Sequence, residues 1–264
     1  MQLRTVWLIH RAGSQAALRQ ARRSAEQLRQ QGEAEGLRQR YLRSAHQLLQ
    51  RFWNSREQPK LLFAGDKATL TLADFTDLNG GAPAGGWKTQ EGGVIHLAAQ
   101  KGTGALISKK EYTNFELTWE WRLEAKGNNG IKYWVTNIKD AKGKGEWLGI
   151  EYQMIDDDGH PDGLRGGSHN TGSIYDLVDS AKDKAKKPIG EWNQSRIVVK
   201  DGKIEHYLNG KLSSSADTKS EEWKAAIAKS KFKNKQGFGP GQGKLMLTEH
   251  GDPCWFRNIV ITEL

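Results

Sequence analysis

Cysteine is nearly absent from this 264-residue chain. Cys254 has no second cysteine to pair with, which excludes a scaffold held by internal disulfides. Long apolar runs are absent too, since no stretch approaches the roughly 18 residues that a membrane-spanning helix needs. The apolar patch 6–9 is shorter than the apolar region of a secretory signal peptide, which has about 7–15 residues. No signal of that kind is readable, so the sequence leaves the location of the protein open.

Several chemistry-bearing motifs are also missing. The chain has no His and Cys spacing typical of zinc sites and no Gly-x-Ser-x-Gly elbow. The glycine-rich stretch 237–243 precedes a predicted strand and lacks the Gly-Lys-Ser/Thr ending, which indicates a loop and not a phosphate site. The acidic stretch from Asp156 fails as an EF-hand, because His160, Pro161 and Gly167 fill positions that need other residues. No cofactor is evident, although a looser oxygen-ligand site for a divalent ion stays open.

Positive charge is unevenly distributed along the chain. The formal net charge is +9, from 40 Lys and Arg against 31 Asp and Glu. The first 60 residues hold twelve of the basic and four of the acidic side chains, while the rest hold 28 and 27. The larger part is therefore nearly neutral, and we expect it not to bind nucleic acid.

Residues 1–58 are predicted to form a basic amphipathic helical extension. Apolar side chains recur at intervals of three and four, and Gly32 and Gly36 divide the pattern into helices over about 14–31 and 35–53. This pattern is typical of a solvated helical hairpin or a partly ordered tail. Contact with a membrane surface or another acidic partner is the alternative.

Residues 60–264 are predicted to form an all-β domain. This part holds eight of the ten tryptophans and 27 of the 30 glycines, among many turn-forming dipeptides. Apolar and polar residues alternate over 115–124, and Asp201-Gly202 marks a tight hairpin turn. About a dozen short strands and one helix over 221–231 favour a jelly-roll β-sandwich.

The predicted strand over 147–155 carries an unusual polar pair. Successive side chains of a strand point to opposite faces, so Glu151 and Gln153 share one face. The strand then runs into the acidic loop that contains Asp156 and His160. This face is either plain solvent-facing sheet or the lining of a polar groove. In a groove, Glu151 would act as an acid or base and Gln153 would recognise hydroxyl groups.

Other candidate site residues lie on neighbouring predicted strands. Lys132 and Trp134 share a face by alternation, and the indole of Trp134 would stack on a sugar ring there, unless it is ordinary packing. His250 ends a strand and belongs to the residue type best suited to proton transfer, with a structural role as the alternative. Arg257, on the last strand, would orient carboxylates or bind hydroxyl groups.

Seven short strings appear in a characteristic order and spacing: Phe115–Leu123, Asn128–Ile131, Gly149–Asp156, Thr171–Asp176, Lys187–Asn193, Glu205–Gly210, and Glu249–Gly251 with Trp255–Ile259. Together they resemble the 3-keto-disaccharide hydrolase family, formerly catalogued as a domain of unknown function. The resemblance covers about residues 61–264, and residues 1–60 lie outside it. It implies a concanavalin-A-like sandwich that acts on glycosides, usually in exported bacterial proteins.

The chemistry that the resemblance implies needs a base, an acid and a group that stabilises an enolate. A ketone at C3 of a sugar acidifies the C2 hydrogen, so that a base can remove it and expel the C1 substituent before water adds back. The catalytic candidates are Glu151, His250 and Asp156. A divalent ion, Arg257 or Gln153 would hold the oxygen charge. The substrate-binding candidates are Gln153, Trp134, Lys132, His160, Tyr175 and Arg257.

Two alternatives stay open. Paired carboxylates could displace the leaving group directly. The same sandwich could also be a non-catalytic carbohydrate-binding module. A catalytic groove should hold Glu151 and His250 within one substrate width, whereas a binding module should show exposed tryptophan without a convergent acid–base pair. The expected partner is a carbohydrate in either case.

Overall fold

The computed structural model describes residues 66–264 except 84, 101 and 140–142. The predicted helical extension over 1–58 lies outside the described residues. Within them, thirteen strands form two antiparallel sheets, accompanied by one α-helix and four short 3-10 helices. Buried side chains from both sheets form one main core between them. The prediction of an all-β sandwich is therefore confirmed.

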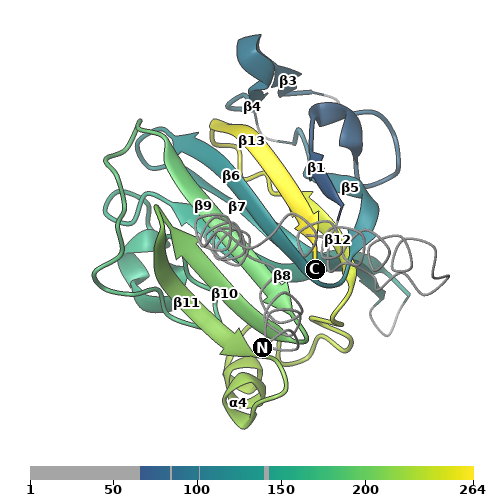
Figure 1. The fold of residues 1–264 in the computed structure, drawn as a ribbon, viewed down its shortest axis with the longest axis vertical. Helices are drawn as coiled ribbons and strands as arrows, with labels where there is room; N and C mark the ends of the chain where they lie inside the picture. Colours follow the sequence, from purple (N-terminus) through teal and green to yellow (C-terminus); the bar gives the residue numbers. More distant parts are fainter. Residues whose placement is uncertain (1–65, 84, 101, 140–142) are drawn as a thin grey trace, which may run out of the picture. The chain divides into compact units, whose positions relative to one another are not determined.

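The larger sheet has eight strands in the order β11-β10-β9-β6-β13-β4-β3, with β1 pairing to β13 (Figure 1). The smaller sheet has the order β2-β5-β12-β7-β8. The last two strands of the chain thus lie inside the sheets, β12 between β5 and β7, and β13 between β6 and β4. The strand bounds are β1 Lys67–Thr69, β2 Phe75–Thr76, β3 Trp87–Thr89, β4 Ile95–Leu97, β5 Leu106–Tyr112, β6 Phe115–Leu123, β7 Asn128–Lys139, β8 Gly145–Ile155, β9 Asn193–Lys200, β10 Lys203–Leu208, β11 Lys211–Asp217, β12 Gly243–Leu247 and β13 Cys254–Glu263.

Strand β6 shows why these residues form a sandwich. Every second side chain from Phe115 to Leu123 is buried, and those between them are half-buried, as alternation predicts. The β9–β10 hairpin turns at Asp201 and Gly202, whose φ angles of 54° and 88° are those that a tight two-residue turn requires. The predicted strand face and the predicted hairpin are both confirmed.

The α-helix α4, Glu221–Lys229, connects β11 to β12. The hydroxyl of Ser220 caps it by accepting a hydrogen bond from the backbone N–H of Trp223 at 3.1 Å. The indole of Trp223 is buried against the main core and anchors the helix. No helix among the described residues is long and apolar enough to cross a membrane. The short 3-10 helices are η1 Leu72–Asp74, η2 Glu91–Gly93, η3 Gly163–Arg165 and η4 Gly167–His169.

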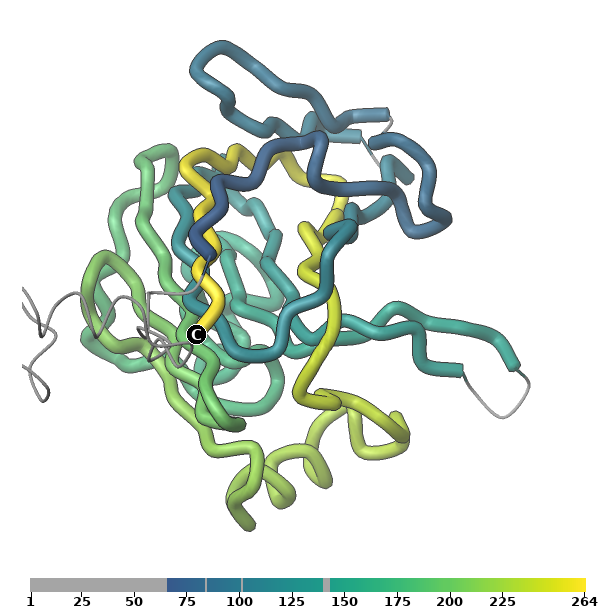
Figure 2. The backbone as a smooth tube through the Cα atoms, turned by 45° about the vertical axis from the view of Figure 1, so that its right-hand side comes forward, coloured from purple at the N-terminus to yellow at the C-terminus, as the bar shows by residue number. Residues whose placement is uncertain are grey.

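The β7–β8 hairpin contains a β-bulge that changes which side chains enter the core. The pairing register shifts between Tyr133 and Thr136, and Trp134 has a φ of 50°. Tyr133 and Trp134 consequently both belong to the main core, while Val135 passes to the other face of the sheet. We call that face, which is turned away from the main core, the outer face. The far end of the hairpin projects from the body of the domain (Figure 2).

Residues 171–176, one of the seven strings of the resemblance, run along the free edge of β8. They make two isolated bridges, both at Ile174, to Tyr152 of β8 and to Val178, and no continuous ladder. The backbone N–H of Tyr175 donates to the carbonyl of Glu151 at 3.0 Å, and that of Gly172 donates to the carbonyl of Gln153 at 2.9 Å. This edge segment therefore places Tyr175 beside Glu151 on the outer face.

Candidate functional site on the outer face of the smaller sheet

A row of side chains crosses the outer face from strand to strand. Met246 on β12 pairs with Lys132 on β7, and Lys132 pairs with Glu151 on β8. Tyr175 follows next to Glu151 through the backbone hydrogen bond of the edge segment. Residues directly opposite in antiparallel strands point to the same face, so these four side chains lie side by side.

Glu151 is at the centre of this row. Its side chain is 6% exposed, and the ammonium of Lys132 lies 3.7 Å from Oε2. The carboxylate needs the space that Gly130 leaves on β7, because a Cβ at Gly130 would lie 2.4 Å from Oε1 of Glu151. A buried carboxylate requires a compensating charge, which Lys132 provides.

His250 reaches the row from the loop that follows β12, and its side chain stays exposed at the rim. The atoms packed around the ring lower the pKa of His250, and Lys132 lowers it further, whereas the charge of Glu151 raises it. The net effect favours a neutral imidazole near neutral pH, while the charge of Glu151 stabilises the protonated form. This pairing is what general acid–base catalysis requires.

Lys231 follows α4 and approaches the row from another direction. Its ammonium lies 4.2 Å from the centroid of the Tyr175 ring. Burial lowers the pKa of Lys231, while the charge of Glu151 raises it. No sequence feature distinguishes this lysine, which is the last residue of the predicted helix over 221–231, whereas α4 ends at Lys229. Its role depends on where the turn after α4 ends.

A hydrogen-bonded network holds Tyr175 in place. The phenol O–H of Tyr175 donates to Oδ2 of Asp162 at 2.8 Å, and Arg165 donates to Oδ1 of the same carboxylate at 2.8 Å. Burial alone would raise the pKa of Asp162, but these two hydrogen bonds and the contact with His169 together lower it. The ring of His169 lies between Asp162, at 3.2 Å, and Asp176, at 3.6 Å. Two carboxylates thus bracket one imidazole behind Tyr175.

Gln153 lies one step along the same face, as the sequence predicts. It is 2% exposed, and its side-chain oxygen accepts the backbone N–H of Met154 at 3.2 Å. The edge segment covers it through the hydrogen bond between its carbonyl and Gly172. Gln153 is therefore buried beneath the edge segment and does not reach the surface of the site.

Asp156, a predicted catalytic residue, is engaged by the backbone around it. Its carboxylate accepts three backbone N–H groups, from Lys126 at 2.8 Å, Gly159 at 3.1 Å and Asp158 at 3.3 Å. It caps the turn that follows β8 and ties it to the β6–β7 turn. A carboxylate occupied in this way by backbone donors holds the loop. These contacts favour a structural role for Asp156, and its catalytic role stays a prediction.

The acidic loop beyond Asp156 is held by similar internal contacts. Asp157 accepts the backbone N–H of Thr171 at 2.7 Å and pairs with Lys184 at 2.8 Å. His160 accepts the backbone N–H of Asp162 through Nδ1 at 3.0 Å. This contact keeps His160 within its own turn, and it does not bring the ring to Glu151. Its predicted role in substrate binding finds no support in these contacts.

Trp134 and Arg257 both lie away from the row. The bulge turns Trp134 inward, where it is 2% exposed and its indole N–H donates to the carbonyl of Thr113 at 2.9 Å. Arg257 lies on β13 of the larger sheet, donates to Glu120 at 2.6 Å and stacks over Trp192 with 4.0 Å to the ring centroid. Trp134 therefore offers no face to a sugar, and Arg257 belongs to the other sheet. Both expectations are corrected.

The outer face continues from the row into an apolar patch. Ile107, Val135 and Met246 form a small buried cluster there, and Trp147 packs against it while keeping part of its surface exposed. Trp147 shares the face of Glu151 because the two are four residues apart on the regular strand β8. The same alternation that indicates Glu151 and Gln153 could have indicated Trp147.

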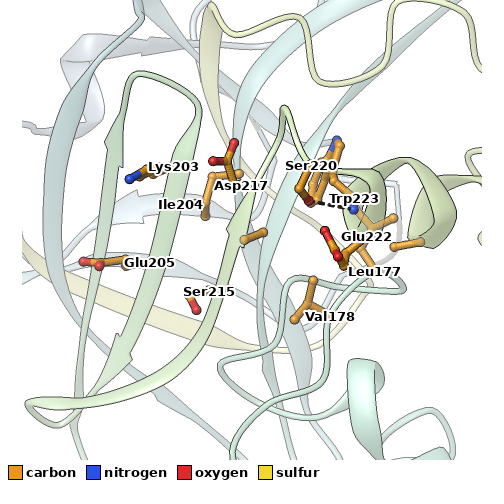
Figure 3. A pocket seen from close by; sticks show the side chains of 12 residues that line it. Leu177, Val178, Lys203, Ile204, Glu205, Ser215, Asp217, Ser220, Glu222 and Trp223 are labelled. Carbon is orange, nitrogen blue, oxygen red and sulfur yellow. Dashed lines mark hydrogen bonds between the residues drawn. The ribbon is translucent and has the colours of Figure 1, made fainter.

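A cavity of about 590 Å³ lies elsewhere, between β10, β11, α4 and residues 177–178 (Figure 3). Its lining includes the apolar side chains of Ile204 and Trp223 and the carboxylates Glu205, Asp217 and Glu222. The first two of these carboxylates already accept hydrogen bonds, from Tyr207 and from the backbone of Lys219. We place the site on the outer face, because the acid, base and cationic groups converge there.

No group of three or more His, Cys, Asp or Glu side chains is arranged to hold a metal ion within the part of the chain that the structure describes. A divalent ion at the site therefore stays a prediction from the sequence. The groups that converge are one carboxylate, one imidazole, two ammonium groups and one phenol. They can exchange a proton and stabilise an anionic oxygen without further ligands.

The fold and this row define a β-sandwich with a polar site on one outer sheet face. Residues 59–262 match the model of the 3-keto-alpha-glucoside-1,2-lyase-like domain, and the chain belongs to that family. The family resemblance found in the sequence is thereby confirmed. A 3-keto-disaccharide hydrolase from Bacteroides thetaiotaomicron is 33% identical over 187 residues, which cover 63% of this chain and 64% of that protein.

Two solved structures from Parabacteroides distasonis ATCC 8503 share the fold, and their names describe both proteins as candidate glycosyl hydrolases. The first is 31% identical with a TM-score of 0.63, and the match covers 74% of this chain and 90% of that one. The second is 26% identical with a TM-score of 0.57, and the match covers 75% of this chain and all of that one. These likenesses extend over the described sandwich.

Proposed function

We propose that the protein hydrolyses glycosidic bonds of 3-keto glycosides, including disaccharides, on the outer face of the smaller sheet. The observation that carries this proposal is the convergence of Glu151, His250, Lys132 and Lys231 on one row, with Tyr175 beside them. The named hydrolase among the relatives supports the substrate class. The partly exposed Trp147 offers an aromatic face at the other end of the patch for a second ring.

In the proposed first step, the neutral imidazole of His250 removes the proton from C2 of the sugar. The C–H electron pair moves toward the C3 ketone as an enolate and then forms the C1=C2 double bond. The C1–O bond breaks, its electron pair stays on the leaving oxygen, and the imidazolium returns the proton to that oxygen. Glu151 stabilises the imidazolium while it carries the proton.

In the second step, water adds across the C1=C2 bond. Its hydroxyl group joins C1 and its proton joins C2, which restores the 3-keto sugar. One water is consumed and nothing is oxidised or reduced, so the net reaction is a hydrolysis. The same acid–base pair serves both steps, because addition of water is the reverse of an elimination.

The decisive experiment compares a 3-keto disaccharide with its unoxidised counterpart, using wild type and Glu151→Gln. We expect the wild type to cleave the 3-keto substrate, and the variant to lose about 10²–10⁴-fold in kcat because it lacks the charge that supports His250. Glu111→Gln, which removes an exposed carboxylate from β5 of the same sheet, is the matched control. Cleavage of the unoxidised sugar at equal rate would favour direct displacement instead. Binding of both sugars without cleavage would favour the carbohydrate-binding module.

A further inference from the structure

Lys231 is held in the site by two independent contacts. Its backbone N–H donates to Oδ2 of Asp176 at 2.8 Å, and its ammonium lies over the Tyr175 ring at 4.2 Å from the centroid. Asp176 and Tyr175 belong to the edge segment beside Glu151. A lysine from the turn after α4 is thus fixed to the segment that completes the row.

The ammonium of Lys231 forms no ion pair with any carboxylate among the described residues, in contrast to Lys132, which pairs with Glu151. A π-face attracts a cation without occupying its N–H groups in linear hydrogen bonds. The donors of Lys231 are therefore available to an oxygen that arrives in the site.

Several charges face this ammonium. Burial lowers the pKa of Lys231, and Lys132 acts in the same direction, whereas Glu151, Asp176 and Asp162 raise it. Although these three carboxylates act on the ammonium, it forms an ion pair with none of them, and an anionic oxygen of a bound ligand would supply that partner.

We infer that Lys231 holds the C3 oxygen of the substrate while negative charge develops on it. The inference rests on the proposed function and adds an oxyanion-stabilising residue to it. When the C2–H electron pair shifts toward the ketone, the ammonium donates a hydrogen bond to the enolate oxygen and keeps its own proton. Lys132 already neutralises Glu151, so the second lysine is the group left to stabilise the enolate.

The test follows exchange of the C2 hydrogen in D2O by NMR, together with turnover, on a 3-keto disaccharide. Lys231→Met should lower both rates by about 10²–10³-fold, the usual effect of removing one oxyanion donor. Lys231→Arg keeps a charge and donors, and it should recover to within about tenfold of wild type. Lys233→Met, an exposed lysine in the same turn, should leave both rates unchanged.

The pH profile supplies a second readout that a purely structural role would not move. Wild-type activity should fall on the alkaline side as Lys231 loses its proton, below the ordinary lysine value of 10.5. This alkaline limb should be absent in Lys231→Arg, because a guanidinium keeps its proton. If Lys231→Met fails to fold, the comparison of the alkaline pH profiles of wild type and Lys231→Arg tests the inference by itself. An alkaline limb in Lys231→Arg that equals the wild-type limb overturns the inference.

The remaining outcomes are separable. Wild-type rates of exchange and turnover in a folded Lys231→Met would overturn the inference and leave the proposed function standing. A wild type that neither exchanges the C2 hydrogen nor turns over the substrate would overturn the proposed function and the inference with it. The wild type alone distinguishes these two failures.

Discussion

Acidification should destabilise the sandwich through one histidine in its core. His206 on β10 is fully buried, and its Nε2 lies 3.0 Å from the hydroxyl of Tyr133 on the opposite sheet. Its Nδ1 lies 3.1 Å from the carbonyl of Ser173 in the edge segment, which assigns the proton to Nδ1. Burial lowers the pKa of His206 from 6.5 to about 3.

The sign follows from proton binding. Between pH 6.5 and pH 3 the unfolded chain binds a proton at this histidine and the folded protein does not, so stability is full above pH 6.5 and declines as pH falls toward 3. One pKa unit corresponds to about 1.4 kcal/mol. Going from pH 7 to pH 5 should thus cost about 2 kcal/mol through His206, and the whole window about 5 kcal/mol.

The assay is urea unfolding at pH 7 and pH 5, followed by tryptophan fluorescence, for wild type and for the double variant Tyr133→Phe/His206→Phe. The double variant removes both partners of the Tyr133–His206 pair, so its free energy of unfolding should fall by about 2 kcal/mol less on acidification than that of wild type. Tyr133→Phe alone keeps the histidine and should retain the wild-type loss. Equal acid losses in wild type and double variant would refute the reasoning.

Two further predictions separate structural from functional residues on and beside the outer face. Trp147→Ala should raise KM for a 3-keto disaccharide about fivefold with little change in kcat, since one aromatic contact is worth about 1 kcal/mol. Steady-state kinetics measure this, and an unchanged KM would remove Trp147 from the site. Asp156→Ala should lower the free energy of unfolding, measured in urea, by about 2–3 kcal/mol, because three backbone donors lose a charged acceptor. The kcat of the folded variant should stay near wild type. A loss of kcat without a loss of stability would instead support a catalytic role for Asp156.

Alternation predicted the outer face of β8 well, because β8 is regular and every second residue keeps its face. It was wrong for Trp134, since one extra residue in β7 reverses the phase and no sequence feature near Trp134 announces the bulge. It could not separate Arg257 from Glu151, because alternation gives the face of a strand and not the sheet to which the strand belongs.

The contributions from loops were harder still to predict. Asp156 has a side chain suited to acid catalysis, and only the three backbone N–H groups that donate to it in the structure indicate a capping role. Lys231 enters the site through the path of the turn after α4, which depends on the burial of Trp223 in the main core and on the stacking of Phe232 with Phe238, and not on local pattern. Residues brought together from distant segments leave no local signature in a single sequence.

The positions of β12 and β13 have a consequence for how the protein comes to be folded. Neither sheet is continuous until the last strands of the chain insert between strands made much earlier. Such non-local pairing requires long chain segments to close into loops before the strand contacts can stabilise the fold, which is typical of slow-folding β proteins. Lys231 and His250 lie in the same late part of the chain. During synthesis, therefore, the acid–base row assembles only as the sandwich itself is completed.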